Sequence, residues 1–175
     1  MKRVLACLLA VLLLASLSVT AFADDPVPSV EAEKQVPAVS EAKDADGNDV
    51  ASKIIITDFE DKEKLPEDAQ KQLDAAAEAL KDLDALVEGN EDLKKQLNGA
   101  AVDAESLFDI SLADDSVKLP VELQLKLANP DHFAALVHFV DGEATLIETE
   151  AKDEFVSFSL EEVGTYAVLS FVDAA

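Results

Sequence analysis

The stretch LVHFVDGEATLIETE, from Leu136 to Glu150, predicts two antiparallel strands joined by a tight turn. Asp141-Gly142 is typical of a two-residue type I′ turn, because both residues tolerate a positive φ. The first strand is apolar on both faces: Leu136, His138 and Val140 share one face, and Phe133, Ala135, Val137 and Phe139 line the other. A strand that is apolar on both faces is typical of the middle of a sheet. The hairpin is therefore expected to lie within a larger sheet.

His138 raises the question of chemistry, because it stands alone among apolar residues. A histidine in such a strand is most often a packed or partly exposed neutral ring with one hydrogen bond. We expect His138 to be part of the sheet. His132, in the turn Pro130-Asp131-His132, is expected to be a solvated turn residue.

Further strands are indicated by alternation of apolar and polar residues. Val117 to Leu127 alternates over its whole length and predicts a long, half-buried strand. Pro120 lies on its polar phase and lacks a backbone donor, so this strand is expected at a sheet edge. Phe155 to Leu160 and Thr165 to Val172 complete the series.

The N-terminal part of the domain predicts a hairpin followed by helices. Val36–Ser40 and Val50–Thr57 read as strands around the turn formers of Lys43–Asp49. A helical apolar stripe then runs from Pro66 to Val87, with Gly89 as its stop, and Asn90 starts a second helix that ends at Leu97. The two helices form an insert at 66–98.

These elements predict a mainly β (α+β) fold: an antiparallel immunoglobulin-like β-sandwich with a two-helix insertion after the first hairpin. The expected core draws on the strands and on the first helix. It comprises Ile54, Ile56, Leu73, Leu80, Phe108, Ile110, Leu119, Val121, Leu123, Val137, Phe139, Phe158, Val168 and Phe171.

The first 23 residues predict a secretory signal peptide. Lys2 and Arg3 precede an apolar run, and Ala21-Phe22-Ala23 offers small residues for cleavage near Ala23. The run is shorter than the roughly 20 residues of a membrane span. Residues 24–35 read as a disordered leader, and 36–175 as a single domain. The lone Cys7 falls in the signal peptide, so the exported chain has no disulfide.

The charge of the exported chain limits the classes of partner that it is expected to bind. Without Lys2 and Arg3, 12 basic residues stand beside 37 acids, a net charge near −25. Arg3 is the chain's single arginine, so the exported chain lacks the side chain that grips phosphate bidentately. We therefore expect no nucleic acid and no anionic membrane among its partners. The acidity indicates solubility, or a surface that loads Ca²⁺ or meets a basic partner.

Several segments resemble a module of uncharacterised secreted and cell-surface proteins of Gram-positive, clostridial-type gut anaerobes. The resemblance rests on Phe108–Leu112, Leu119–Leu123, Val137–Glu143, Phe155–Phe158 and Gly164–Val168, with a V-H-x-x-D-G hairpin and a Tyr-Ala-Val core in the last strand. It implies an immunoglobulin-like sandwich and an extracellular location, and no activity. The chain has no LPxTG motif, so it is expected to be released or held non-covalently.

The residues point away from catalysis. A nucleophile requires an adjacent base, and zinc requires clustered ligands. His132 and His138 would lie roughly 20 Å apart along one strand, and the 37 acids single out no pair for carboxylate catalysis. With one tyrosine, Tyr166, and no tryptophan, sugar stacking is disfavoured, and Tyr166 is expected to pack at a sandwich corner. We predict no catalytic residue, no cofactor and no enzyme activity.

Calcium is the alternative that stays open. Asp44, Asp46 and Asp49 lie in a segment like the start of a Ca²⁺ loop, but an EF-hand needs glycine sixth and an acid twelfth. Counted from Asp44, those positions hold Asp49 and Ile55, so a hairpin turn is favoured. A looser site would use Asp114, Asp115 and Asp141.

The sequence thus predicts a non-catalytic, exported structural or interaction module. Its partner would be a protein or a cell-envelope component. A Ca²⁺-dependent extracellular binding protein is the alternative, and a carboxylate-pair hydrolase is a more distant one.

Overall fold

The predicted hairpin is present in the computed structural model, which describes residues 36–172. Strand β5 (Phe133–Val140) pairs antiparallel with β6 (Glu143–Ile147). Asp141 and Gly142 join them, and both have a positive φ, 51° and 82°. The predicted signal peptide with its cleavage near Ala23, and the leader 24–35, lie outside the described residues.

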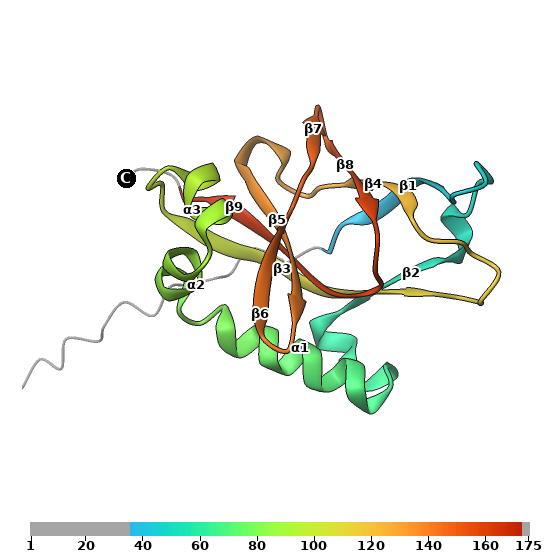
Figure 1. Cartoon of the computed structure of the whole chain (residues 1–175), viewed down its shortest axis with the longest axis horizontal. Coiled ribbons are helices and arrows are strands. Elements are labelled where there is room, and N and C mark those ends of the chain that lie inside the picture. Colours follow the sequence, from blue (N-terminus) through green and yellow to red (C-terminus); the bar gives the residue numbers. More distant parts are fainter. Residues whose placement is uncertain (1–35, 173–175) are drawn as a thin grey trace, which may run out of the picture. The chain divides into compact units, whose positions relative to one another are not determined.

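The other strands and the helices follow the chain in the order that Figure 1 labels. The strands are β1 (Ala38–Lys43), β2 (Ile54–Asp58), β3 (Val102–Leu112), β4 (Val121–Lys126), β7 (Glu150–Lys152), β8 (Phe155–Leu160) and β9 (Gly164–Phe171). The α-helices are α1 (Glu67–Ala79), α2 (Leu83–Gly89) and α3 (Glu91–Leu97). The 3₁₀-helices are η1 (Ala51–Lys53), η2 (Phe59–Lys64) and η3 (Pro130–His132).

The strands form two antiparallel sheets. The first has the order β1-β4-β8-β7, and the second has the order β2-β3-β9-β5-β6. In Figure 1 the helices α1, α2 and α3 lie on the opposite side of the second sheet from β1, β4 and β8. The described chain is thus mainly antiparallel β with a few helices, consistent with the predicted sandwich.

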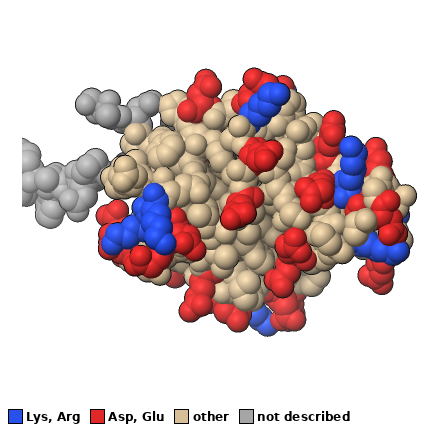
Figure 2. All heavy atoms as spheres, turned by 45° about the horizontal axis from the view of Figure 1, so that its top comes forward, with Lys and Arg blue, Asp and Glu red and all other residues tan. Residues whose placement is uncertain are grey.

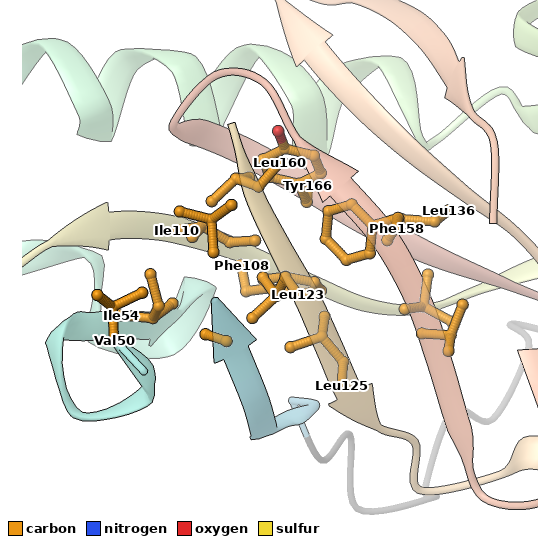
Figure 3. Close-up of a cluster of buried hydrophobic side chains, with 14 of the residues drawn as sticks. Val50, Ile54, Phe108, Ile110, Leu123, Leu125, Leu136, Phe158, Leu160 and Tyr166 are labelled. Carbon is orange, nitrogen blue, oxygen red and sulfur yellow. The ribbon is translucent and has the colours of Figure 1, made fainter. Parts of the chain in front are cut away.

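Alternating strands from both sheets build the core between them. Figure 3 shows Phe108 and Ile110 from β3 and Tyr166 from β9 beside Leu123 from β4 and Phe158 from β8. All five are at most 5% exposed. Burial of such side chains at about 25 cal/mol per Å² of apolar surface is the main force that holds the sheets together.

A second core lies between the helices and the other face of the second sheet. Ala135, Val137 and Phe139 of β5 pack there with Ala76 of α1 and with other helical residues, whereas Leu136 points into the sandwich core. Strand β5 is apolar on both faces because its sheet is covered on both faces. The predicted central position is confirmed, since β5 lies between β9 and β6.

Phe133 departs from the predicted alternation. It packs against the sandwich core rather than with Ala135 and Val137. The register of β5 against β9 shifts between Phe133 and Ala135, and such a bulge reverses the face of the residues before it.

Three amide side chains fasten the helices to the β5–β6 hairpin. Gln72 of α1 donates from Nε2 to Asp141 Oδ1 at 2.9 Å and accepts from the Asp141 N–H at 2.8 Å. Asn90 donates to the Ala144 carbonyl and Gln96 to the Ala134 carbonyl, both at 2.7 Å. Asn90 also caps α3 by accepting from the Leu93 N–H.

The predicted pairing of the first two strands in a hairpin is wrong, because the two strands belong to different sheets. Lys43 and Asp49 form an isolated antiparallel bridge, but η1 then leads the chain from the first sheet to the second. As a result β1 pairs with β4 in one sheet, while β2 pairs with β3 in the other.

The helical segment contains three α-helices rather than the predicted two. The predicted helix from Pro66 to Val87 is interrupted between α1 and α2. Asp82, which lies within the predicted helix, instead caps α2 by accepting from the Ala85 N–H. The second predicted helix matches α3, and Asn98 ends it in the left-handed conformation.

The strand after Pro120 is not an edge strand. Strand β4 begins at Val121 and lies between β1 and β8. Pro120 precedes the ladder, so its missing N–H removes no hydrogen bond from it. Leu119 and Phe171, both expected in the core, are 38% and 39% exposed because they lie before β4 and at the end of β9.

Strand β7 was not predicted, because its three residues are all exposed and carry no alternation. Residues 152–154 read as a turn in the sequence; the turn is present at Asp153, which has a positive φ, but Lys152 ends β7. Among residues 36–172, no helix is long and apolar enough to cross a membrane.

Candidate binding site

A gap in the second sheet defines the candidate site. Strand β2 pairs with β3 only between Phe108 and Leu112, because the chain leaves the sheet at Asp58 and enters η2. Residues 102–107 of β3 pair with β9 on one side. On their other side, none of the described residues continues the sheet.

An apolar pocket of about 310 Å³ lies beside this part of β3. We call it the β3-edge pocket. Its apolar lining comes from four segments of the chain and comprises Val36, Phe59, Ala77, Leu80, Ala104 and Leu107. Its polar lining comprises Asp58, Glu60, Lys81 and Ser106. Val36 packs against the sandwich core and Leu107 against the helix-side core, so the pocket lies where the two cores meet.

Ser106 is the polar residue buried in this pocket. It is 4% exposed, and its hydroxyl has no hydrogen-bond partner among the described residues. A buried hydroxyl without a partner costs about 1–3 kcal/mol of desolvation. Such groups are rare in folded proteins, and a ligand that supplies the missing partner is one explanation.

A β-bulge interrupts β3 beside the pocket. The register of β3 against β9 shifts between Ala104 and Ser106, so Glu105 is the extra residue. The bulge places Ala104 on the helix-facing side of the sheet with Leu107, whereas Ser106 keeps the phase of Phe108 and Ile110. Bulges of this kind often redirect a side chain at a functional site.

Two of the three charged residues that line the pocket, Asp58 and Lys81, have hydrogen-bond or ion-pair partners. The Asp58 carboxylate accepts from the Glu60 N–H at 3.0 Å and caps η2. Lys81 is ion-paired with Glu78 on the helix surface. Two acids and one paired lysine leave the rim of the pocket acidic.

A buried polar pair lies on the helix-facing side of the same sheet. Asp109 of β3 stands opposite Thr165 of β9, and the two residues are 4% and 1% exposed. The Thr165 hydroxyl has no hydrogen-bond partner among the described residues. Burial raises the pKa of the Asp109 carboxyl to about 6. Neither residue lines the β3-edge pocket.

His138 is a packed ring, as predicted. It is 9% exposed and stacks on Tyr166 with the ring centroids 4.5 Å apart. Burial lowers the pKa of His138, and the charge of Glu162 opposes this shift. The Tyr166 hydroxyl donates to the Glu162 carbonyl at 2.6 Å, and its side chain is buried in the sandwich core. Its pKa is raised, first by burial.

The residues proposed for calcium are engaged in the turn after β1. Asp44 Oδ1 accepts from the backbone N–H groups of Asp46 and Asn48 at 3.0 and 2.9 Å. Both oxygens also accept from the Asn48 amide, and these bonds lower the pKa of Asp44. Asp46 pairs with Lys118, and Asp49 accepts from the Ala51 N–H. The predicted turn is present.

Asp114, Asp115 and Asp141, the acids considered for a looser calcium site, are not brought together. Asp114 bonds to Ser116 and Lys53, and these contacts lower its pKa. Asp141 instead bonds to Gln72 of α1. Within residues 36–172 no three His, Cys, Asp or Glu side chains are grouped to hold a metal ion. On the face drawn in Figure 2, acidic side chains are scattered over most of the surface, and lysines stand beside them.

Ser106 and its pocket were missed by the sequence reasoning, which followed β alternation only from Phe108 onward. The sequence from Val102 to Leu112 gives no signal of the bulge, because its even-numbered residues, apolar apart from Ser106, alternate without a slip. The pocket itself depends on where β2 ends, and local pattern does not encode that.

The comparisons with known proteins supply no relative. No protein-family model, curated protein or solved structure matches the chain. Function is therefore argued from the geometry of the β3-edge pocket.

Proposed function

We propose that this protein is a non-catalytic, exported interaction module of the cell envelope or extracellular space, and that it binds its partner at the β3-edge pocket. The buried Ser106 hydroxyl, without a partner in an apolar pocket, carries the proposal. A pocket with apolar walls and a few polar groups is typical of a binding site, because the walls give affinity and the polar groups give orientation.

The state of Ser106 supports binding rather than catalysis. A nucleophilic serine needs a base within hydrogen-bond reach, but Ser106 Oγ has no hydrogen-bond partner among the described residues. Asp58 is used as a helix cap, and Lys81 is paired with Glu78. His138 is stacked on Tyr166 in a different part of the sheet.

Export is supported by the first 23 residues and by the charge. The chain from Asp24 has a net charge near −25, which favours solubility outside the cell. The resemblance to surface proteins of Gram-positive anaerobes remains part of this proposal. N-terminal sequencing of the protein from culture medium should give Asp24 as the first residue, and an uncleaved chain that stays with the cells would contradict export.

We further propose that the sandwich is immunoglobulin-like. In that fold one sheet has the order A-B-E-D and the other contains G-F-C, to which variable domains add C′. Strands β1-β4-β8-β7 match the first order, and β3-β9-β5-β6 match G-F-C-C′ if β3 takes the place of G. The Tyr166 hydroxyl bond to the Glu162 carbonyl resembles the tyrosine corner at the start of strand F. In this assignment β2, the helices and β3 are inserted between A and B.

The binding proposal is tested by asking whether the pocket accepts an apolar group with a hydrogen-bonding atom. The chain from Asp24 to Ala175 is titrated with 2-propanol and ¹H–¹⁵N spectra are recorded. We expect saturable shifts of the amides of Ala77, Ser106 and Leu107. Ala77→Leu, which fills the pocket from α1, should abolish them.

Ala85→Leu is the matched control, because Ala85 is an exposed helical alanine outside this pocket. It should leave the shifts unchanged. Shifts that do not saturate, or that survive Ala77→Leu, would contradict a binding site at β3.

A further inference from the structure

The unpaired side of β3 suggests how a partner would be held. Strand β2 covers β3 only from Phe108 to Leu112, so among residues 36–172 the segment 102–107 has neighbours in the ladder on the β9 side alone. In an antiparallel sheet, alternate residues direct their N–H and C=O groups to opposite sides. The bulge at Glu105 interrupts this alternation, but on each side of the bulge alternate residues direct their backbone groups to the side that β2 does not reach.

The pocket next to this edge suits one or two apolar side chains of a polypeptide. Its volume of about 310 Å³ is at the lower end of the roughly 300–1,000 Å³ of small-molecule sites. Ala104 and Leu107 come from the edge itself, and Ala77 and Leu80 form the wall on α1. A strand added to β3 would direct alternate side chains toward this wall.

The acidic charge of the pocket and of the β3 edge indicates which kind of polypeptide segment would bind there. Asp58 and Glu60 line the pocket, and Asp103 is exposed on the unpaired part of β3. Lys81 is the basic residue of the lining, and it is paired with Glu78. A second copy of this chain would bring another net charge near −25 and is repelled, whereas a cationic segment is attracted.

We infer that the edge of β3 at residues 102–107 is the docking site for an extended, lysine- or arginine-bearing segment of a partner protein. The segment continues the sheet where β2 stops and places an apolar side chain in the β3-edge pocket. Main-chain hydrogen bonds supply affinity, and the pocket and acids supply selection. This inference rests on the proposed binding function of the same pocket.

The probe is a fluorescein-labelled eight-residue peptide in which lysines alternate with valines around a central leucine. Fluorescence anisotropy is measured with the chain from Asp24 to Ala175. We expect saturable binding that weakens at least tenfold in 0.5 M NaCl, because ion pairing is screened. Ala77→Leu should weaken binding at least tenfold, and Ala85→Leu should change it less than twofold.

Two further peptides separate strand addition from charge attraction. Replacing alternate valines by proline removes backbone donors and should abolish binding, and replacing the lysines by glutamates should also abolish it. Equal binding of the proline peptide, or equal binding by Ala77→Leu, would overturn the inference.

Amide shifts provide a readout that does not depend on a variant. In ¹H–¹⁵N spectra of the unsubstituted chain, the peptide should move the amides of residues 102–107 more than those of β6. Shifts confined to other regions would overturn the inference. If 2-propanol enters the pocket and the peptide does not bind, strand docking fails and the proposed function stands. If neither binds, both fail.

Discussion

The buried carboxyl of Asp109 destabilises the folded protein when it is ionised. Its residue is 4% exposed, on the helix-facing side of the second sheet. Burial raises its pKa from 3.8 to about 6. The folded state therefore binds this proton more tightly than the unfolded state. Its contribution makes the free energy of unfolding fall as pH rises from about 4 to 6, and the loss is complete above pH 6.

We predict that Asp109→Asn stabilises the protein at pH 7 by roughly 1–3 kcal/mol, since two pKa units correspond to about 2.7 kcal/mol. At pH 4 the gain should vanish. Denaturant unfolding at both pH values measures this. The lowered pKa of His138 acts in the opposite direction, but it is common to both proteins and cancels in the difference. An equal gain at both pH values would refute the assignment.

Gly164 lies where a larger residue would press against the ring of His138. A Cβ at Gly164 would lie 3.2 Å from His138 Nε2, and the residue has a φ of +144°. Gly164→Ala should therefore lower the free energy of unfolding by about 1–3 kcal/mol.

Gly89→Ala is the comparison for Gly164→Ala. Gly89 is helical, and nothing lies within 4 Å of its added Cβ. That change should stabilise by about 0.4–1 kcal/mol. Similar effects of the two substitutions, measured in the same urea titration, would remove the contact argument.

At the scale of elements, α1 is held over the β5–β6 turn by the paired bonds of Gln72 to Asp141. Gly142 also lies 3.7 Å (measured from an added Cβ) from Ala75 of α1. We expect Gln72→Ala to destabilise by about 1 kcal/mol and to speed hydrogen exchange of the β5–β6 amides.

Lys71→Ala, on the same helix, removes an exposed ion pair with Asp68 and should change the free energy of unfolding by less than about 0.5 kcal/mol. If the hairpin amides exchange equally fast in both variants, Gln72 does not fasten the helix.

Elements marked by local chemistry could be predicted from the sequence. The Asp141-Gly142 turn, the two-faced strand β5 and the Asn98 helix end each carry their signal within a few residues. The partition of β1 and β2 between sheets could not be predicted. It depends on the path of the loop after Asp44, and alternation is the same whichever sheet a strand joins.

The candidate site was beyond sequence reasoning for the same reason. The pocket exists because β2 ends at Asp58 while β3 extends back to Val102. The even-numbered residues of β3 alternate without a slip, so the sequence does not mark the bulge at Glu105, and the unpaired state of Ser106 requires knowing every neighbour. The acidic turn was assigned correctly because Asp44 forms bonds with residues close in sequence.

For the whole molecule, the large negative charge opposes the folded state by self-repulsion. Raising NaCl from 0.05 to 0.5 M should therefore raise Tm. At constant ionic strength, 2 mM Ca²⁺ should raise Tm no more than 2 mM Mg²⁺, because the Asp44 oxygens are held by amides of their own turn. A Ca²⁺-specific rise of several degrees in a thermal melt would instead favour the calcium-binding function.

The central claim is that an apolar group fits beside Ser106 at the edge of β3. The most direct measurement is of nuclear Overhauser effects between the methyl groups of bound 2-propanol and the protein. We predict cross-peaks to the methyl groups of Ala77, Ala104 and Leu107, and none to Ala85. Cross-peaks only elsewhere on the protein, or none at saturating alcohol, would contradict a binding site in this pocket.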